Sequence, residues 1–321
     1  MTILVTGGAG FIGSHFVERL LGEGHAVHVL DSFHDYYSPK IKRSNLAAVK
    51  DHPQFQLVEG DILDRDLVDG MFDEHGYEKV VHLAARAGVR PSIVDPHAYE
   101  EVNCRGTLNL LEAAHRTDVK RFVFASSSSV YGNNDKVPFS EMDRVDRPIS
   151  PYAATKLAGE MLCHAAHHLH GLPIVCLRFF TVYGPRQRPD MAIHKFTRLI
   201  DEGEEVPIFG DGSTSRDYTF YEDCVDGIVA AMQSDLGFEI INLGDHRQIP
   251  LSLLVELIEA SLGKEARRKH LSMQPGDVQT TFADISKAQR LLGYEPRFPI
   301  ERGVEIFVDW YREHAKLLRP S

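Results

Sequence analysis

The chain has 321 residues, which is enough for about two domains. Its 43% hydrophobic and 25% charged residues are ordinary for a folded water-soluble protein, and a formal net charge of -11 argues against non-specific binding to nucleic acid or anionic membranes. The four cysteines lack C-x-x-C spacing, which favours free thiols. No apolar run approaches the ~20 residues needed to span a bilayer, and no signal peptide precedes the first predicted strand. We therefore expect a cytoplasmic protein with no membrane and no nucleic-acid partner.

A glycine-rich turn follows the first predicted strand. Residues 2–6 form a short apolar run, typical of a buried parallel strand, and a helical pattern begins after Gly13. Between them Gly7, Gly10 and Gly13 recur every third residue, and with Gly8 they also satisfy G-x-G-x-x-G. This motif provides a tight turn and a close backbone approach, and it directs a helix N-terminus at a pyrophosphate. Its position between a strand and a helix predicts a dinucleotide site.

An acidic residue ends the second predicted strand. Residues 26–30 are followed by Asp31, near the position where a carboxylate binds the adenosine ribose hydroxyls of a dinucleotide. A carboxylate there repels a 2'-phosphate, so NAD is favoured over NADP. The alternative is an aspartate that merely ends a strand.

Strands and helices continue to alternate beyond this point. We expect strands at 55–58, 79–83 and 121–125 and a long helical stretch around 97–115. This alternation predicts an α/β fold with a Rossmann-type doubly wound parallel sheet, whose ligands bind beyond the carboxyl ends of the strands. Asp61, Ala84 and the serine run 126–129 follow three of these strands, so they belong to the active edge. A serine run is otherwise typical of a solvated loop.

A tyrosine and a lysine lie at the start of a predicted helix. Ser150 is a good N-cap and Pro151 suits the first helical position, so Tyr152 lies on the opening turn. Lys156 lies four residues on, on the same helical face. A nearby ammonium favours the phenolate and lowers the pKa of a tyrosine. The pair therefore predicts a group that accepts a proton from a hydroxyl.

Two similar patterns favour other interpretations. Tyr36 and Lys40 have the same spacing, but Pro39 lies between them and no helix cap precedes them, so we expect a loop. The predicted helix to about residue 170 carries four histidines, at 164, 167, 168 and 170, which indicate a surface rather than a metal site because no carboxylate or cysteine completes it.

The last 150 residues are less regular. A strand at 173–177 leads into a loop at 178–191 that is rich in arginine and proline, and Arg186, Arg188 and Arg216 are candidates to hold ligand phosphates. Residues 221–243 are predicted to form a helix and a strand that rejoins the first sheet, and 250–314 three helices with loops. We expect an NAD-binding domain over 1–179, rejoined by about 217–245, and a smaller C-terminal α/β substrate-binding domain, mainly within 180–321.

These motifs occur in one order along the chain, and together they resemble the extended short-chain dehydrogenase/reductase family, specifically its nucleotide-sugar epimerases. The segments 87–90, 126–132 and 178–185 are most similar to those of UDP-glucuronate 4-epimerases. The resemblance covers essentially the whole chain. It implies NAD-dependent 4-epimerisation of UDP-glucuronate to UDP-galacturonate through a transient 4-keto sugar, without decarboxylation. The alternative is a 4-epimerase of a neutral UDP-hexose or UDP-N-acetylhexosamine.

The resemblance also implies residue roles. Tyr152 would be the base, Lys156 would hydrogen-bond the nicotinamide ribose and lower the pKa of that tyrosine, and Ser127 would hydrogen-bond O4 of the sugar. Besides Tyr152 and Lys156, the implied cofactor-binding residues are Gly7, Gly10, Phe11, Ile12, Gly13, Asp31, Asp61, Ile62, Leu83, Ala84, Ala85 and Asn103. Family members commonly dimerise through the helices near 97–115 and 151–170, so we expect a homodimer.

The hydroxyl-bearing positions indicate which sugar is bound. Related decarboxylases carry a glutamate just before Val-Tyr-Gly and dehydratases an Asp-Glu pair, whereas this chain has Ser128 and Ser129. Without a carboxylic acid there, dehydration and assisted decarboxylation lack their proton-transfer group. We infer that Ser128, Ser129 and Thr181 hold a substrate carboxylate.

The remaining implied substrate contacts are Ser127, Arg90, Arg188, Arg216 and Asp277. Gln274 stands where several relatives carry a phosphate-binding arginine, so Arg188 is expected to supply that charge instead.

Overall fold

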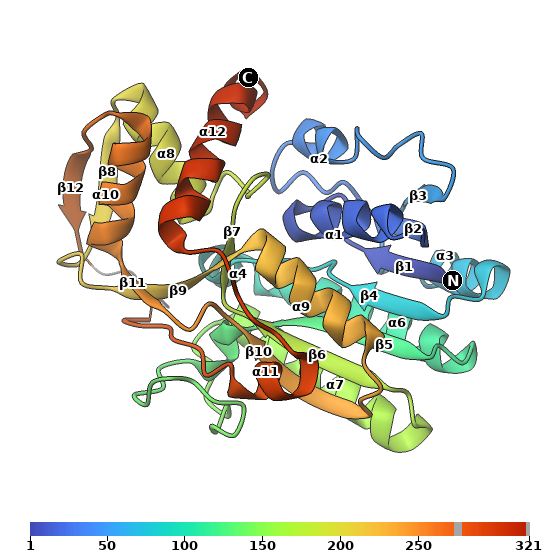
Figure 1. Cartoon of the computed structure of the whole chain (residues 1–321). Coiled ribbons are helices and arrows are strands. Elements are labelled where there is room, and N and C mark those ends of the chain that lie inside the picture. Colours follow the sequence, from blue (N-terminus) through green and yellow to red (C-terminus); the bar gives the residue numbers. More distant parts are fainter. Residues whose placement is uncertain (273–277, 319–321) are drawn as a thin grey trace.

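A seven-stranded parallel sheet forms the centre of the molecule (Figure 1). The structure is a computed structural model that describes residues 1–272 and 278–318. The strand order is β10-β6-β5-β4-β1-β2-β3, and every neighbouring pair runs parallel. The strands are β1 (Thr2–Thr6), β2 (Ala26–Asp31), β3 (Phe55–Glu59), β4 (Lys79–His82), β5 (Arg121–Ser127), β6 (Ile174–Phe179) and β10 (Phe238–Leu243). The predicted Rossmann-type fold is confirmed.

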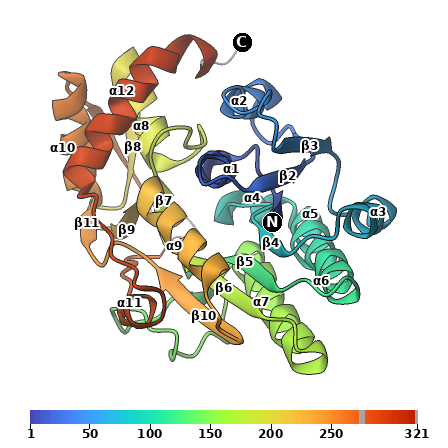
Figure 2. The same ribbon diagram turned by 45° about the vertical axis from the view of Figure 1, so that its right-hand side comes forward.

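Helices cover both faces of this sheet (Figure 2). One layer contains α1 (Phe11–Gly22), α9 (Tyr221–Gln233) and α11 (Ser286–Leu292), and the opposite layer contains α3 (Arg65–His75), α6 (Thr107–Arg116) and α7 (Pro151–His170). Each layer buries its own apolar cluster against the sheet, with Phe16 and Ile228 in the first and Phe72 and Leu110 in the second. Two buried faces explain why the strands are nearly continuous apolar runs.

A smaller part lies beside the carboxyl ends of these strands. It contains a three-stranded sheet of β7 (Thr181–Tyr183), β9 (Ser215–Phe220) and β11 (Gln248–Pro250), and a parallel pair of β8 (Glu205–Phe209) and β12 (Arg267–Leu271). Helices α8 (Ala192–Glu202), α10 (Leu251–Leu262) and α12 (Ile300–Leu318) pack around a third apolar cluster. Strand β10 then pairs with β6, so the chain rejoins the central sheet as predicted. The boundary near residue 179 stays a prediction.

The helical stretch predicted around 97–115 is present: α5 (Pro96–Glu100), a π-helical turn (Glu101–Gly106) and α6 follow one another without a gap. One expectation about an individual element was wrong. The expected loop at 36–40 is partly helical, because α2 (Pro39–Asn45) begins at Pro39, which suits a first helical turn. The helices predicted over 250–314 are present, but β11 and β12 were not predicted. Both are short and β12 is exposed along its length, so neither has the apolar alternation of a half-buried strand.

Candidate active site

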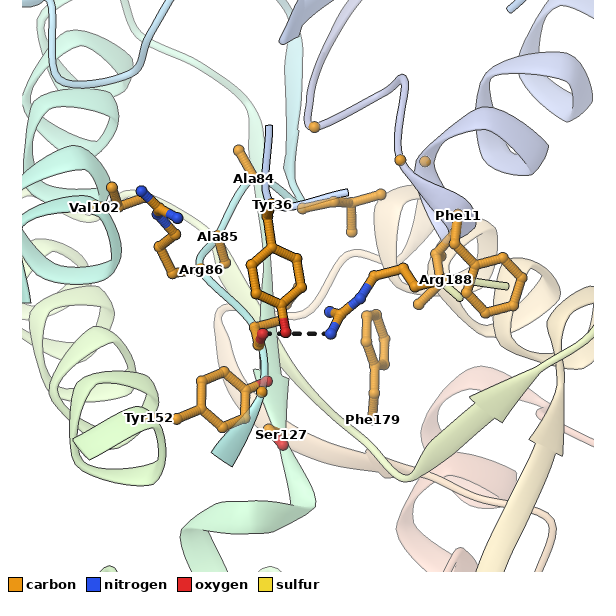
Figure 3. A pocket seen from close by; sticks show the side chains of 18 of the residues that line it. Phe11, Tyr36, Ala84, Ala85, Arg86, Val102, Ser127, Tyr152, Phe179 and Arg188 are labelled. Carbon is orange, nitrogen blue, oxygen red and sulfur yellow. Dashed lines mark hydrogen bonds between the residues drawn. The ribbon is translucent and has the colours of Figure 1, made fainter. Parts of the chain in front are cut away.

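A cavity of about 500 Å³ lies at the carboxyl ends of the central strands. Its walls come from the turns after β1, β2, β4 and β5, from the first turns of α1 and α7, and from the 178–191 loop. Figure 3 shows Tyr152 and Ser127 on one side of it and Tyr36 and Arg188 meeting nearby. The topology therefore brings together the motifs that the sequence places far apart.

The glycine turn forms a cradle for a dinucleotide. Gly7 has φ +71°, and a Cβ at this position would lie 2.7 Å from the amide nitrogen of Ala84. A Cβ on Gly13 would lie 2.3 Å from the carbonyl oxygen of Gly7, so only glycine fits either position. Gly10 precedes α1 without a side-chain cap, which leaves first-turn amides of α1 for an anion. These residues fit the pyrophosphate of NAD.

Asp31 ends β2 beside the glycine turn, where a dinucleotide ribose is expected. One of its carboxylate oxygens accepts the Ala9 N–H at 3.0 Å and the other accepts the Phe33 N–H at 2.9 Å. Each carboxylate oxygen has a further lone pair, so both remain able to accept from ribose hydroxyls. The other predicted cofactor residues that line the cavity are Phe11, Ile12, Asp61, Ile62, Leu83, Ala84 and Ala85.

The first turn of α7 is fixed against the end of β5. The Ser150 hydroxyl accepts the Ala153 N–H at 3.1 Å, which confirms the predicted N-cap. One turn on, Lys156 Nζ donates to the Ala125 carbonyl oxygen at 2.7 Å. The Ser127 hydroxyl accepts the Ser129 N–H at 3.1 Å and lies 3.2 Å from the Ser129 hydroxyl. Tyr152, Lys156 and Ser127 therefore line one wall of the cavity.

The electrostatics of this wall differ from the prediction. Burial raises the pKa of Tyr152, and a hydrogen bond from Ser127 and the positive charge of Arg188 oppose that shift only in part. Burial dominates, and Lys156, which was expected to lower this pKa, is not among the groups that oppose the shift. Burial also lowers the pKa of Lys156 to about 8.

The predicted substrate residues divide into two sets. Ser127, Ser128, Ser129, Thr181 and Arg188 line the cavity. Arg188 forms a salt bridge with Asp190, in which Nε and Nη2 donate to its two carboxylate oxygens at 2.9 and 2.6 Å. A guanidinium held in this way and exposed to a cavity can donate its other N–H groups to a phosphate.

The other predicted arginines do not line this cavity. The guanidinium of Arg90 lies 4.7 Å from the Phe209 ring centroid and borders a second cavity, and Arg216 Nη1 donates to the Ser215 carbonyl at 2.8 Å. Arg186 Nη2 donates to Glu18 of α1 at 2.7 Å. The ligand roles expected of these three arginines stay predictions. Asp277, together with Gln274, lies outside the described residues.

Asn103 was also expected to contact the cofactor, and it does not line the cavity. It is buried on the π-helical turn, where its amide oxygen accepts the Arg86 N–H at 2.8 Å and its amide nitrogen donates to the Arg86 carbonyl at 3.0 Å and to the Thr155 hydroxyl at 3.0 Å. A single side chain therefore joins the turn after β4 to α7. These bonds fix the backbone of Arg86, which directly follows Ala84 and Ala85.

Several lining residues were not predicted. They include His34, Tyr36, Tyr37, Lys42, Arg86, Val102 and Asp190. Arg86 directly follows the predicted Ala84–Ala85 pair, so its position after a strand end could have indicated that it lines the cavity. Tyr36 was expected in a loop and was not predicted as a site residue, and only the fold brings that loop beside the 178–191 segment.

Comparisons with known proteins agree with this site. The NAD dependent epimerase/dehydratase family model matches residues 3–244. A UDP-glucuronate 4-epimerase of Thermodesulfobacterium geofontis is 44% identical over 317 residues, covering 98% of both chains. The structure of UDP-glucuronic acid 4-epimerase from Bacillus cereus with UDP-glucuronic acid and NAD is 39% identical, with a TM-score of 0.93 and coverage of 98% of this chain and 99% of that one. The structure of UDP-glucose 4-epimerase from Thermotoga maritima with UDP-glucose is 35% identical, with a TM-score of 0.91 and coverage of 98% and 100%.

The matched region spans the glycine cradle, Asp31 and the Tyr152–Lys156 pair, which are the features that predicted NAD. The expected cofactor and the expected enzyme class are confirmed. The chain belongs to the NAD-dependent epimerase/dehydratase family.

Proposed function

We propose that this enzyme is a UDP-glucuronate 4-epimerase, which interconverts UDP-glucuronate and UDP-galacturonate through a 4-keto sugar without loss of CO2. Two of the relatives compared above carry the name of this activity. The observation that carries the proposal is the wall of hydroxyls formed by Ser128, Ser129 and Thr181, next to the Tyr152–Lys156 pair. The cavity holds both a redox site and a place for a carboxylate.

Tyr152 is proposed to be the proton acceptor. Its side chain lies beside Ser127 at the end of β5, so a sugar O4 between them could accept a hydrogen bond from the Ser127 hydroxyl and give its proton to Tyr152 in the phenolate form. NAD+, when bound, supplies a reversible hydride acceptor for C4. Lys156 holds the nicotinamide end of the site. Once the 4-keto sugar has rotated in the cavity, Tyr152 would return the proton to O4, and a bound cofactor would supply the hydride for the opposite face of C4.

Hydroxyls at the carboxylate subsite explain why CO2 would be retained. Oxidation of a glucuronate at C4 gives a β-keto acid, which loses CO2 readily. A carboxylic side chain at Ser129 would transfer a proton or repel the substrate carboxylate, whereas hydroxyls of Ser128, Ser129 and Thr181 donate to it and hold it. Arg188 is proposed to bind the diphosphate, in keeping with its place in the cavity.

Separate incubations with UDP-glucuronate and UDP-glucose test the proposal. NMR of the products is expected to show UDP-galacturonate from the first and no change in the second. If UDP-glucose were epimerised and UDP-glucuronate were not, the neutral-sugar alternative would replace the proposal. The similarity to the Thermotoga maritima enzyme supports that alternative. A UDP-pentose and CO2 would show that the hydroxyl wall does not restrain decarboxylation.

The assembly and location belong to the same proposal. Exposed apolar side chains on α6 and α7, namely Leu108, Met161 and Leu169, support a homodimer through these helices. Light scattering of the purified protein tests this, and a monomer would refute it. None of the helices within 1–272 and 278–318 is long and apolar enough to cross a membrane. A cytoplasmic location, consistent with the unpaired cysteines, is tested by cell fractionation.

A further inference from the structure

Tyr36 and Arg188 meet across the cavity from different parts of the fold (Figure 3). Tyr36 lies on the connection between β2 and α2, and Arg188 on the loop that follows β7. The Tyr36 hydroxyl donates to Asp190 Oδ2 at 3.1 Å, and the Arg188 guanidinium lies 5.1 Å from the centroid of the Tyr36 ring. Tyr36 therefore contacts both members of the Arg188–Asp190 ion pair.

These contacts fix the guanidinium in two directions. In the plane of the guanidinium, Arg188 Nε and Nη2 donate hydrogen bonds to the Asp190 carboxylate at 2.9 and 2.6 Å. The Tyr36 ring packs against the same guanidinium through a cation–π contact. Nη2 also lies 3.4 Å from the Ala87 carbonyl oxygen. An arginine has five N–H donors in a rigid fork, so this arrangement determines which of them point at a ligand.

The loop that carries Tyr36 is tied to the cofactor site. It leaves β2 at Asp31, whose carboxylate accepts the Phe33 N–H at 2.9 Å. Further along, the His34 ring lies 2.7 Å from Arg86 Nη2, and the His34 carbonyl accepts from Lys42 at 2.7 Å. The position of Tyr36 is therefore set by the segment that is expected to hold the NAD ribose.

We propose that Tyr36 is a positioning residue for the substrate: it holds Asp190 and Arg188 so that the guanidinium faces the diphosphate of the nucleotide sugar. The proposal rests on the function proposed above and adds a residue to its binding site. It also makes the loop beyond Asp31 a shared wall of the cofactor and substrate sites. Burial and the charge of Asp190 raise the pKa of Tyr36, so its hydroxyl stays protonated and donates at neutral pH.

Binding of UDP to the NAD-loaded enzyme, measured by calorimetry, tests the proposal. Tyr36→Phe keeps the ring against Arg188 and removes only the hydrogen bond to Asp190. We expect about tenfold weaker UDP binding, as for loss of one hydrogen bond to a charged group, with bound NAD retained. In turnover of UDP-glucuronate, KM should rise while kcat stays within about twofold. Tyr77→Phe is the matched control, because its hydroxyl also bonds a side chain, His28 at 3.1 Å, but lies away from the cavity.

A double-mutant cycle separates positioning from a general structural effect. If Tyr36 acts through Arg188, Tyr36→Phe should weaken UDP binding by less than about twofold when added to Arg188→Lys. The proposal would be overturned if Tyr36→Phe left the UDP affinity unchanged. It would also be overturned if the fold-losses of UDP affinity of the two single variants multiplied in the double variant. UDP carries no sugar, so failure of the wild type to convert UDP-glucuronate would refute the proposed function and leave this cycle interpretable.

Discussion

Lys156 Nζ donates to the Ala125 carbonyl oxygen at 2.7 Å, so the ammonium of α7 lies directly under the end of β5. Ser127 is two residues further along that strand and Tyr152 one helical turn earlier. This bond helps to set the separation of the two groups that we propose to contact the sugar O4. The relative positions of Tyr152, Lys156 and Ser127 therefore depend on how α7 packs on the sheet.

Tyr152→Phe removes the proposed base and keeps the ring. We expect kcat to fall by roughly 10²–10⁴-fold, the usual contribution of a positioned acid–base group. NAD should still co-purify, because the phenol hydroxyl is not part of the glycine cradle. Turnover is followed by NMR and bound NAD by absorbance after denaturation. Wild-type turnover in this variant would rule out Tyr152 as the base.

The pH dependence of stability reports on Lys156. Its folded-state pKa is lowered to about 8, below its ordinary value, so between the two the unfolded chain binds the extra proton. Stability therefore rises with pH in that window, by an amount on the order of 1–3 kcal/mol for this group. Urea unfolding at several pH values above 8 should show this rise in the wild type and a flatter dependence in Lys156→Met.

Lys120→Met is the control for this measurement, because the Lys120 side chain is 65% exposed and its ammonium pairs with Asp118. It should follow the wild-type pH dependence. Parallel curves for the wild type and Lys156→Met would show that the ammonium of Lys156 is not destabilised by burial.

Removal of one hydroxyl from the proposed carboxylate subsite tests the substrate assignment. Ser129→Ala should raise the KM for UDP-glucuronate by about fivefold to tenfold, as for loss of one hydrogen bond to a charged group, and leave UDP binding unchanged. It should also increase the share of turnovers that release CO2. Ser261→Ala, on α10 with its hydroxyl bonded to the Leu257 carbonyl, is a matched control. An unaltered KM and product ratio would place the carboxylate elsewhere.

Asp217 joins three segments and was not singled out in the sequence. It is fully buried, and its carboxylate accepts the backbone N–H groups of Asp245, His246 and Ala283 at 2.7, 3.2 and 3.0 Å. Asp217→Ala leaves these donors unsatisfied, so we expect a loss of about 3 kcal/mol in the free energy of unfolding. Asp211→Ala, at an exposed turn, should change it by less than about 0.5 kcal/mol. Equal losses in a denaturant titration would contradict this.

The sequence predicted the parts of the site that depend on local physics. Glycine spacing, the Ser150 cap and apolar strands each act within a few residues, so the cradle and the start of α7 were found. Asn103, Arg90 and Arg216 lie outside the cavity lining, because local spacing does not show which side chains the fold brings to the cavity, and their ligand roles stay predictions. Tyr36 was missed for the same reason: its contacts with Asp190 and Arg188 span about 150 positions and appear only after the fold closes.

The glycine cradle provides the last prediction. In Gly13→Ala the new Cβ would lie 2.3 Å from the Gly7 carbonyl oxygen, so the turn must shift and the amides that face the pyrophosphate move with it. We expect loss of bound NAD. Gly22→Ala at the end of the same helix has no atom within 4 Å of the new Cβ, so it should retain NAD and gain up to about 1 kcal/mol of stability from helix propensity. NAD content and thermal unfolding of the two variants measure both effects, and retention of NAD by Gly13→Ala would show that the turn tolerates a side chain.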